Sequence, residues 1–162
     1  MPLEIERKFL VLDYPHIVSW PVPMRTINIH QRFMPTEDPG VVERVRSVHD
    51  GGGVIRYYHT IKKHIEGGIN EETEREIPAL EFNDLWGQTI HQTISKVRVV
   101  FDWKGHTFEL DVFMSPATMV PMLEVELESM DEEVELPPFI KIEREVTGEK
   151  EYTNWQIAQR LG

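Results

Sequence analysis

The sequence contains no cysteine, and it has no run of 18 or more apolar residues. The first absence excludes a disulfide framework and a thiolate metal site. The second argues against a membrane-spanning helix, and an apolar N-terminal segment typical of a secretion signal is also missing. We therefore expect a cytoplasmic protein that has no membrane partner.

Positive charge is scarce, since 17 lysines and arginines stand against 28 aspartates and glutamates, for a net charge of −11. This balance disfavours non-specific binding to nucleic acid, which needs a basic surface. The length of 162 residues suits a single domain with a sizeable core, covering residues 1–162. The 11 prolines and 10 glycines are spread along the chain and predict a compact fold with many turns.

Polar and apolar residues alternate with a period of two along eight segments, which is typical of β-strands. Several of these segments are joined by short glycine-containing tips, as at residues 50–53, 66–68 and 104–105. The expected strands cover residues 3–11, 25–34, 41–48, 54–64, 69–77, 93–103, 106–114 and 120–128. Tight connections favour an antiparallel meander, so we expect a mainly β (α+β) fold: an eight-stranded antiparallel β-barrel, closed or nearly closed.

Helices are expected in three places outside the barrel. Residues 79–90 contain apolar side chains at helical intervals, and residues 148–161 predict a C-terminal helix that packs on the sheet. The acidic run at residues 129–135 predicts a short, solvated helix, and a proline-rich linking segment follows it.

The charged residues of the expected strands largely separate by sign, strand by strand. The basic pairs are Arg44 with Arg46 and Lys96 with Arg98; the acidic pairs are Glu74 with Glu76, Glu109 with Asp111, and Glu124 with Glu126. A solvated face is the alternative for any one strand, but such a face often mixes signs, because opposite charges attract across strands. The segregation therefore favours charged faces that point into the barrel. A lumen lined by both signs would suit a polyanion together with divalent cations.

Glu4, Glu6 and Lys8 share one face of the first strand, because alternate side chains of a strand point the same way. Carboxylates about 7 Å apart on one face repel each other, and a divalent metal would balance their charge. The chain lacks cysteine and its seven histidines are dispersed, so its oxygen ligands favour Mg²⁺ or Mn²⁺ over zinc.

In their order along the chain, these motifs resemble the CYTH, or triphosphate tunnel metalloenzyme, superfamily, and especially its short bacterial branch. The resemblance rests on Glu4-x-Glu6-x-Lys8, the two basic pairs, Thr60-Ile61-Lys62, Phe108-Glu109-Leu110-Asp111-Val112-Phe113, Leu123-Glu124-Val125-Glu126 and Tyr152-x-Asn154. It implies a barrel that encloses a tunnel and a metal-dependent hydrolysis of the terminal phosphoanhydride of a triphosphate. The substrates it implies are inorganic triphosphate, thiamine triphosphate or nucleoside triphosphates.

The resemblance also implies a role for each charged residue of the tunnel. The substrate-binding residues would be Arg44, Arg46, Arg56, Lys62, Lys96 and Arg98. The ligands of Mg²⁺ or Mn²⁺ would be Glu4, Glu6, Glu124 and Glu126, while Glu74, Glu76, Glu109 and Asp111 would either join them or hold the basic side chains in place. Lys8 would be the catalytic residue. It would orient the attacking water, or deprotonate it if neighbouring cations lower the pKa of Lys8, and it would otherwise act only through its charge.

One position departs from the pattern of the branch, since relatives tend to carry a tyrosine where this chain has Phe33. A phenol could help Lys8 to handle a proton and Phe33 cannot, so the preference for inorganic triphosphate is open. Tyr58 is a candidate substitute on the charged face of its strand. Two other functions stay open: a class IV-type adenylyl cyclase, and a non-catalytic module that binds polyphosphate or triphosphate. The sequence does not distinguish a monomer from a homodimer.

Overall fold

The computed structural model describes residues 2–160, a part of the chain that contains nine strands and two α-helices. The strands are β1 (Leu3–Asp13), β2 (Met24–Met34), β3 (Val41–His49), β4 (Ile55–Glu66), β5 (Ile69–Ile77), β6 (Ile90–Trp103), β7 (His106–Ser115), β8 (Met122–Leu127) and β9 (Lys141–Glu145). The helices are α1 (Ala79–Trp86) and α2 (Asn154–Arg160), with 3₁₀ turns η1 (Ile17–Ser19) and η2 (Lys150–Tyr152). Within residues 2–160, no helix is long and apolar enough to cross a membrane.

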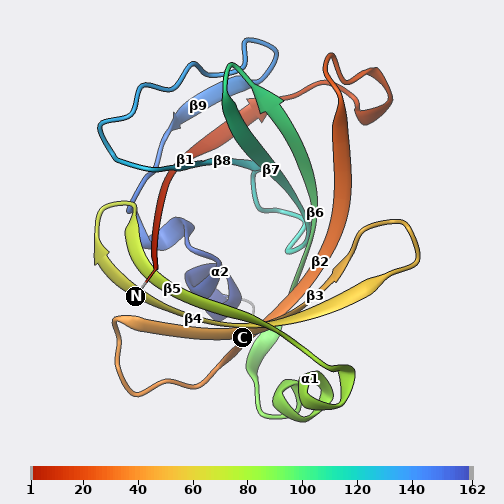
Figure 1. The fold of residues 1–162 in the computed structure, drawn as a ribbon, viewed down its shortest axis with the longest axis vertical. Helices are drawn as coiled ribbons and strands as arrows, with labels where there is room; N and C mark the ends of the chain where they lie inside the picture. Colours follow the sequence, from red (N-terminus) through yellow and green to blue (C-terminus); the bar gives the residue numbers. More distant parts are fainter. Residues whose placement is uncertain (1, 161–162) are drawn as a thin grey trace.

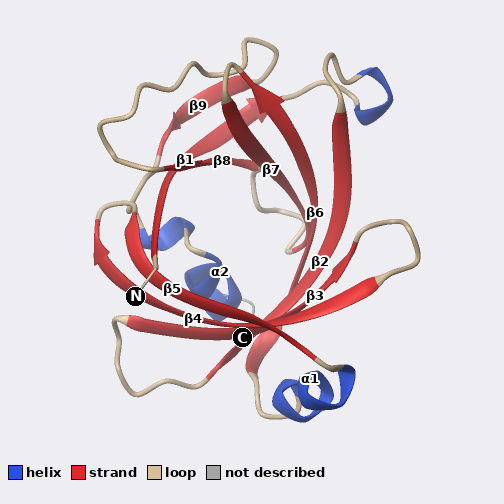
Figure 2. Cartoon of the chain, in the orientation of Figure 1, coloured by secondary structure: helices blue, strands red, loops and turns tan. Residues whose placement is uncertain are grey.

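Eight of the strands close into an antiparallel barrel, so this prediction is confirmed. Neighbours pair in the order β5-β4-β3-β2-β6-β7-β8-β1, and β1 then pairs with β5, where Leu3 faces Glu71 and Ile5 faces Ile69. The ninth strand, β9, pairs with β1 beyond this short closing contact. Figure 1 shows the resulting ring of strands, with α1 outside it and α2 seen through it. Figure 2 shows the same view coloured by secondary structure.

The outward faces of β1 and β6–β8 are apolar and are covered by segments that run outside the barrel. Phe101 and Phe108 are stacked on this face with 5.7 Å between their ring centroids. Trp20 and Phe139, from two covering segments, both contact Phe101. Because side chains alternate along a strand, an apolar outer face leaves the charged residues of the same strands pointing into the barrel.

A second apolar cluster lies inside the barrel, at the end where α2 packs. Phe33, Ile94 and Phe113 share their faces of β2, β6 and β7 with the inward charged residues, and they pack against Ile157 and Ala158 of α2. All five side chains are at least 95% buried. The C-terminal helix was expected on the outside of the barrel, and this expectation is wrong. The bore is therefore charged in its middle and apolar at one end.

The acidic segment after β8 differs from the prediction, because no helix forms at residues 129–135. The Glu132 carboxylate accepts hydrogen bonds from the backbone N–H of Glu128 and from His106, which holds the segment in a turn. Val134 and Leu136, two residues apart, then pack against the outer core in a stretch without regular secondary structure. The short strand β9, which follows, was not predicted.

The two other predicted helices form over shorter spans. Helix α1 ends at Trp86 instead of residue 90, and β6 begins at Ile90. The C-terminal helix is divided, because Thr153 is extended between η2 and α2 and its hydroxyl accepts a hydrogen bond from the Gln156 N–H. Residue 161, the last of the predicted C-terminal helix, lies outside the described residues.

Candidate active site

The inward charged faces line a cavity of about 780 Å³ in the bore of the barrel. Most of the charged residues singled out in the sequence reach it, as expected. The lining includes Glu4, Glu6, Lys8, Arg44, Arg46, Lys62, Glu74, Lys96, Arg98, Glu109, Glu124 and Glu126. The other three of these residues, Arg56, Glu76 and Asp111, are not part of this lining.

Asp111 lies beneath the cavity and anchors two of its cations. Its carboxylate is 2.7 Å from Lys96 Nζ and accepts two hydrogen bonds from Arg98, of 2.7 and 3.0 Å. Burial would raise the pKa of Asp111, but the attraction of Arg98 and Lys96 prevails and the net shift is strongly downward. Asp111 thus stays ionised at neutral pH and holds the basic side chains in place, one of the two roles considered for it.

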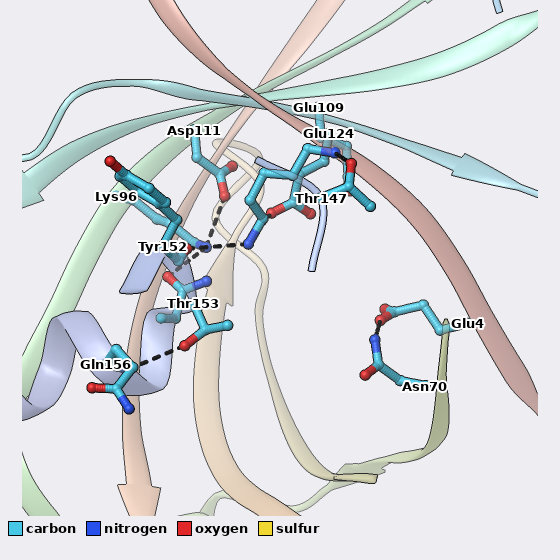
Figure 3. Close-up of polar contacts among 12 residues, drawn as sticks. Glu4, Asn70, Lys96, Glu109, Asp111, Glu124, Thr147, Tyr152, Thr153 and Gln156 are labelled. Atoms are coloured by element: carbon cyan, nitrogen blue, oxygen red, sulfur yellow. Dashed lines mark hydrogen bonds and ion pairs between the residues drawn. The ribbon is translucent and has the colours of Figure 1, made fainter. Parts of the chain in front are cut away.

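Lys96 is the most deeply buried of the basic groups, with 2% of its surface exposed. Burial lowers the pKa of its ammonium to about 8, although Asp111 attracts the charged form. Its Nζ also donates to Asn154 Oδ1 of α2 at 3.3 Å. Figure 3 shows Lys96 between Asp111 and the C-terminal segment.

Lys8 forms an ion pair with Glu124, with 3.4 Å between Lys8 Nζ and Glu124 Oε1. Its Nζ donates to the backbone oxygen of Tyr152 at 3.3 Å. Burial alone would lower the pKa of Lys8, but Glu124 and Glu6 reverse this effect and the net shift is upward. Glu124 and Glu6 are also two of the expected metal ligands, so this shift describes Lys8 beside carboxylates that hold no metal. The ammonium form is the one that this environment favours.

The four carboxylates expected to hold a metal face the bore from β1 and β8. In the register of these strands Glu6 is opposite Glu126, and Lys8 is opposite Glu124. Burial, followed by repulsion from Glu124, raises the pKa of Glu6 to about 8. Burial also raises the pKa of Glu124, but Lys8 and other cations outweigh it and bring the value to about 2. At Glu6, burial and the repulsion from Glu124 thus outweigh the attraction of Lys8 and Lys62.

This donor set fits a hard divalent cation, because it consists of carboxylate oxygens whose mutual repulsion a bound cation would relieve. The carboxylates are not preorganised for a metal. Within residues 2–160, no three histidine, aspartate or glutamate side chains are arranged to hold a metal ion. Glu4 instead lies 2.8 Å from Lys62 and accepts a hydrogen bond from Asn70. Metal binding would require these carboxylates to leave their present partners.

Glu72 is a member of this network that the sequence analysis did not single out. It lies 3.4 Å from Lys62, and burial together with a hydrogen bond to Glu4 raises its pKa to about 7. Its position on β5, two residues before Glu74, places it on the same inward face. That shared face was the sequence signal that could have identified it.

Arg44 and Arg46 differ in how far they are already paired. Arg46 is 3.4 Å from Glu74, whose other neighbour is the Thr60 hydroxyl at 2.7 Å. Arg44 has no ion pair with any of the described residues within 4.0 Å, although it lines the cavity. Arg44 is therefore available to an anionic ligand without breaking an ion pair.

A second cavity, of about 330 Å³, adjoins the first and contains Arg56 and Tyr58. It shares Arg46, Glu74, Arg98 and Glu109 with the main cavity, so the bore continues past these residues. Arg56 pairs with Glu76 at 3.3 Å, and both side chains are more than half exposed. Lys8 does not line this cavity, so Tyr58 is not placed to substitute for the tyrosine that Phe33 replaces.

Phe33 itself lines the main cavity and packs edge-on against Trp155 of α2, with 5.5 Å between ring centroids. It belongs to the apolar layer at the end of the bore. The position is thus occupied by a group that fixes α2 and carries no exchangeable proton.

Comparison with known proteins gives two curated relatives of similar size. The chain is 33% identical over 159 residues, 96% of each chain, to an inorganic triphosphatase of Nitrosomonas europaea. It is also 33% identical over 117 residues, 72% of this chain and 70% of the relative, to an inorganic triphosphatase of Acetivibrio thermocellus. The chain belongs to the CYTH superfamily.

A solved structure agrees with this assignment. The inorganic triphosphatase NE1496 superposes on this CYTH protein with a TM-score of 0.63 and 29% identity, covering 98% of this chain and 95% of the other. No family model matches the chain. The alignment with the Nitrosomonas europaea relative covers 96% of this CYTH protein and therefore most of the residues that line the charged bore.

Proposed function

We propose that this CYTH domain, residues 1–162, is a divalent-metal-dependent triphosphatase that hydrolyses the terminal phosphoanhydride of inorganic triphosphate inside the barrel. The observation that carries the proposal is the cavity of about 780 Å³, in which buried cations and carboxylates converge. A cavity of this size accommodates a small polyanion. The name shared by both curated relatives supports inorganic triphosphate as the substrate.

Five basic residues of the main cavity would bind the phosphate oxygens: Arg44, Arg46, Lys62, Lys96 and Arg98. Guanidinium and ammonium groups bind phosphate through charge-assisted hydrogen bonds, which strengthen in a low-dielectric site. The same groups would stabilise the negative charge that develops during phosphoryl transfer. Arg56, in the second cavity, would contact the far end of a longer or larger substrate.

Glu4, Glu6, Glu124 and Glu126 would hold Mg²⁺ or Mn²⁺, which supplies charge neutralisation and lowers the pKa of a nucleophilic water. Glu109 would keep Arg98 oriented, as Asp111 does for Lys96, and Glu74 would hold Arg46 before the substrate binds. Lys8 would donate a hydrogen bond from its ammonium group to the substrate or to the attacking water. The carboxylates around Lys8 favour this electrostatic role over proton abstraction.

The experiment that tests the proposal is phosphate release by the purified protein with Mg²⁺ or Mn²⁺. Inorganic triphosphate, thiamine triphosphate and ATP are compared side by side, and cyclic AMP is measured in the ATP sample. We expect selective turnover of inorganic triphosphate and its loss when EDTA removes the metal. Cyclic AMP formation would instead support the cyclase, and binding without turnover of any of the three would support the binding module. Full activity in EDTA would refute the metal site.

Arg44→Ala is expected to lower kcat/KM for inorganic triphosphate about 10- to 100-fold, the range for losing a hydrogen bond to a charged group. The melting temperature should not fall, because Arg44 has no ion-pair partner among the described residues and its removal relieves repulsion in the bore. Steady-state kinetics and thermal melting measure the two effects. Lys63→Ala is the control, since Lys63 is an exposed lysine on the outer face of β4. Equal kinetics for both variants would remove Arg44 from the site.

The value of kcat/KM is expected to fall as the pH rises above about 8. Lys96 has a pKa of about 8 in the folded protein, so it binds an anion as an ammonium below this pH and loses its charge above it. The pH dependence of kcat/KM reports the pKa values of the free enzyme, so the decline should follow the pKa of Lys96 in the protein without substrate. A pH profile measures it, and Lys96→Arg should move the decline to higher pH, since a guanidinium stays charged. If the wild type and Lys96→Arg lost activity over the same pH range, the decline would have to come from another titratable group.

A further inference from the structure

Gln31 is a buried polar residue in the bore that the proposed function does not use. Its side chain is fully buried, with 0% of its surface exposed. Both polar atoms of its amide, Oε1 and Nε2, are without a hydrogen-bond partner among residues 2–160. A buried amide without partners destabilises a fold, because it has lost its hydrogen bonds to water and gained none.

Gln31 lines neither cavity itself, but its inward neighbours line both. On the same face of β2, the preceding inward residue, Ile29, lines the second cavity, and the following one, Phe33, lines the main cavity. The residue directly opposite on β3 is Arg46, which lines both cavities. Direct cross-strand partners on one face have Cβ atoms about 4.5–5.5 Å apart, within reach of a hydrogen bond between long side chains.

The unpartnered atoms of Gln31 and Arg46 are complementary. Arg46 Nε is a buried donor without a partner in the described chain, and Gln31 Oε1 is a buried acceptor in the same condition. Among residues 2–160, the hydrogen bond that holds the Arg46 guanidinium runs from a terminal nitrogen to Glu74 at 3.4 Å, near the upper limit for a hydrogen bond, and the guanidinium also lies 5.8 Å from the centre of the Tyr58 ring. This hydrogen bond is weak enough for a bound anion to replace it.

A neutral acceptor suits this position better than a carboxylate. Arg46 is buried beside Arg44 and Arg98, and burial followed by their repulsion lowers the pKa of its guanidinium to about 10. An amide oxygen would orient the guanidinium and leave its positive charge uncompensated. A carboxylate would neutralise that charge and repel a polyanion.

We propose that Gln31 is a positioning residue for the anion site: its Oε1 accepts a hydrogen bond from Arg46 Nε when a bound triphosphate draws the guanidinium away from Glu74. The Nε2 amide then remains as a neutral, buried donor beside the residues that line the two cavities. This inference rests on the proposed function insofar as the bore binds a triphosphate, but it does not require hydrolysis.

The test is calorimetric titration with inorganic triphosphate in EDTA, where no metal-dependent turnover occurs, together with thermal melting. Gln31→Met, which conserves volume, should melt at or above the wild-type temperature, because it removes an unpaired buried amide, yet it should bind the anion about tenfold more weakly. Gln31→Glu should bind more weakly still. In an Arg46→Ala background, Gln31→Met should cause no further loss, as expected for two residues that act through one interaction.

Ser47→Ala is the matched control, since Ser47 is a buried polar residue on the opposite face of β3, and its affinity for the anion should equal that of the wild type. A structural role for Gln31 would lower the melting temperature of Gln31→Met and leave its affinity unchanged. Wild-type affinity in Gln31→Met, or an equal loss with and without Arg46, overturns the inference. Failure of the wild type to turn over any triphosphate, with anion binding retained, would overturn only the triphosphatase.

Discussion

Replacing Lys8 with alanine should lower kcat for inorganic triphosphate by about 100- to 1,000-fold, the loss that follows removal of one preorganised donor from a transition state. The KM should change much less, because six other lysines and arginines line the main cavity, and five of them are proposed to bind the substrate in its ground state. Steady-state kinetics separates the two constants. A pure KM effect would make Lys8 a binding residue only.

Lys8→Arg distinguishes an electrostatic role from a role in proton transfer. Arginine keeps the positive charge and cannot act as a base at neutral pH, so an electrostatic Lys8 should be partly replaced by it. We expect Lys8→Arg to retain well over ten times the kcat of Lys8→Ala. Equal inactivity of the two variants would contradict the charge-based role that Glu124 and Glu6 favour by raising the pKa of Lys8.

Gly68→Ala should damage both the stability and the activity, although residue 68 carries no functional group. A Cβ at this position would clash with the backbone oxygen of Glu6 and would lie 2.8 Å from Thr147 Cγ2. The tip between β4 and β5 is packed against β1 here, where the Glu6 N–H donates to the Gly68 oxygen at 3.0 Å. Either the tip or β1 must move, which costs about 1–3 kcal/mol in a packed region.

The movement should also reach the charged bore, because Glu6 and Lys8 belong to the displaced part of β1. A misplacement of about 1 Å can cost on the order of 100-fold in rate, so we expect a loss of activity of this size. Thermal melting and triphosphate turnover measure the two effects. Gly52→Ala, at the tip between β3 and β4, is the control, since its Cβ would contact only the movable Asp50 side chain. Normal activity in Gly68→Ala would show that the tip is free to move.

The barrel and its charged interior could be predicted because both follow from a local pattern. A period of two in Val41–His49 places Arg44 and Arg46 on one face whatever the partner strands are. The segregation of signs then indicated that the charged faces meet in the bore. The partners of each charge could not be predicted in the same way. That Asp111 lies beneath both Lys96 and Arg98 depends on the register of β6 and β7.

The position of α2 could not be derived from its own residues. Ile157 and Ala158 are apolar, and an apolar helix face packs equally well against the outside of the sheet or within the bore. The deciding feature is the set of large apolar residues, such as Phe33 and Phe113, on strand faces that are otherwise charged. Those residues interrupt the charged pattern at one end of the barrel, and this interruption was the overlooked signal.

The segment between β8 and β9 was mispredicted because charge was given more weight than spacing. Glutamates dominate residues 129–135, but Val134 and Leu136 are two residues apart, which is the spacing of an extended chain. In β9 the only strongly apolar residue is Ile142, so five residues carried too little alternation to be recognised as a strand.

The apolar layer at the α2 end of the bore has a consequence for how a polyanion finds the site. The protein as a whole is negatively charged, with a net charge of −11, and repels such a ligand at long range. At the ionic strength of a cell, screening limits this repulsion to about 8 Å. A low-dielectric wall beside buried arginines concentrates their field within the bore, where salt screens it poorly. The net negative charge of the protein therefore opposes the approach of a polyanion, whereas the buried arginines attract it once it enters the bore. Moderate salt should speed the approach without much weakening the binding in the bore.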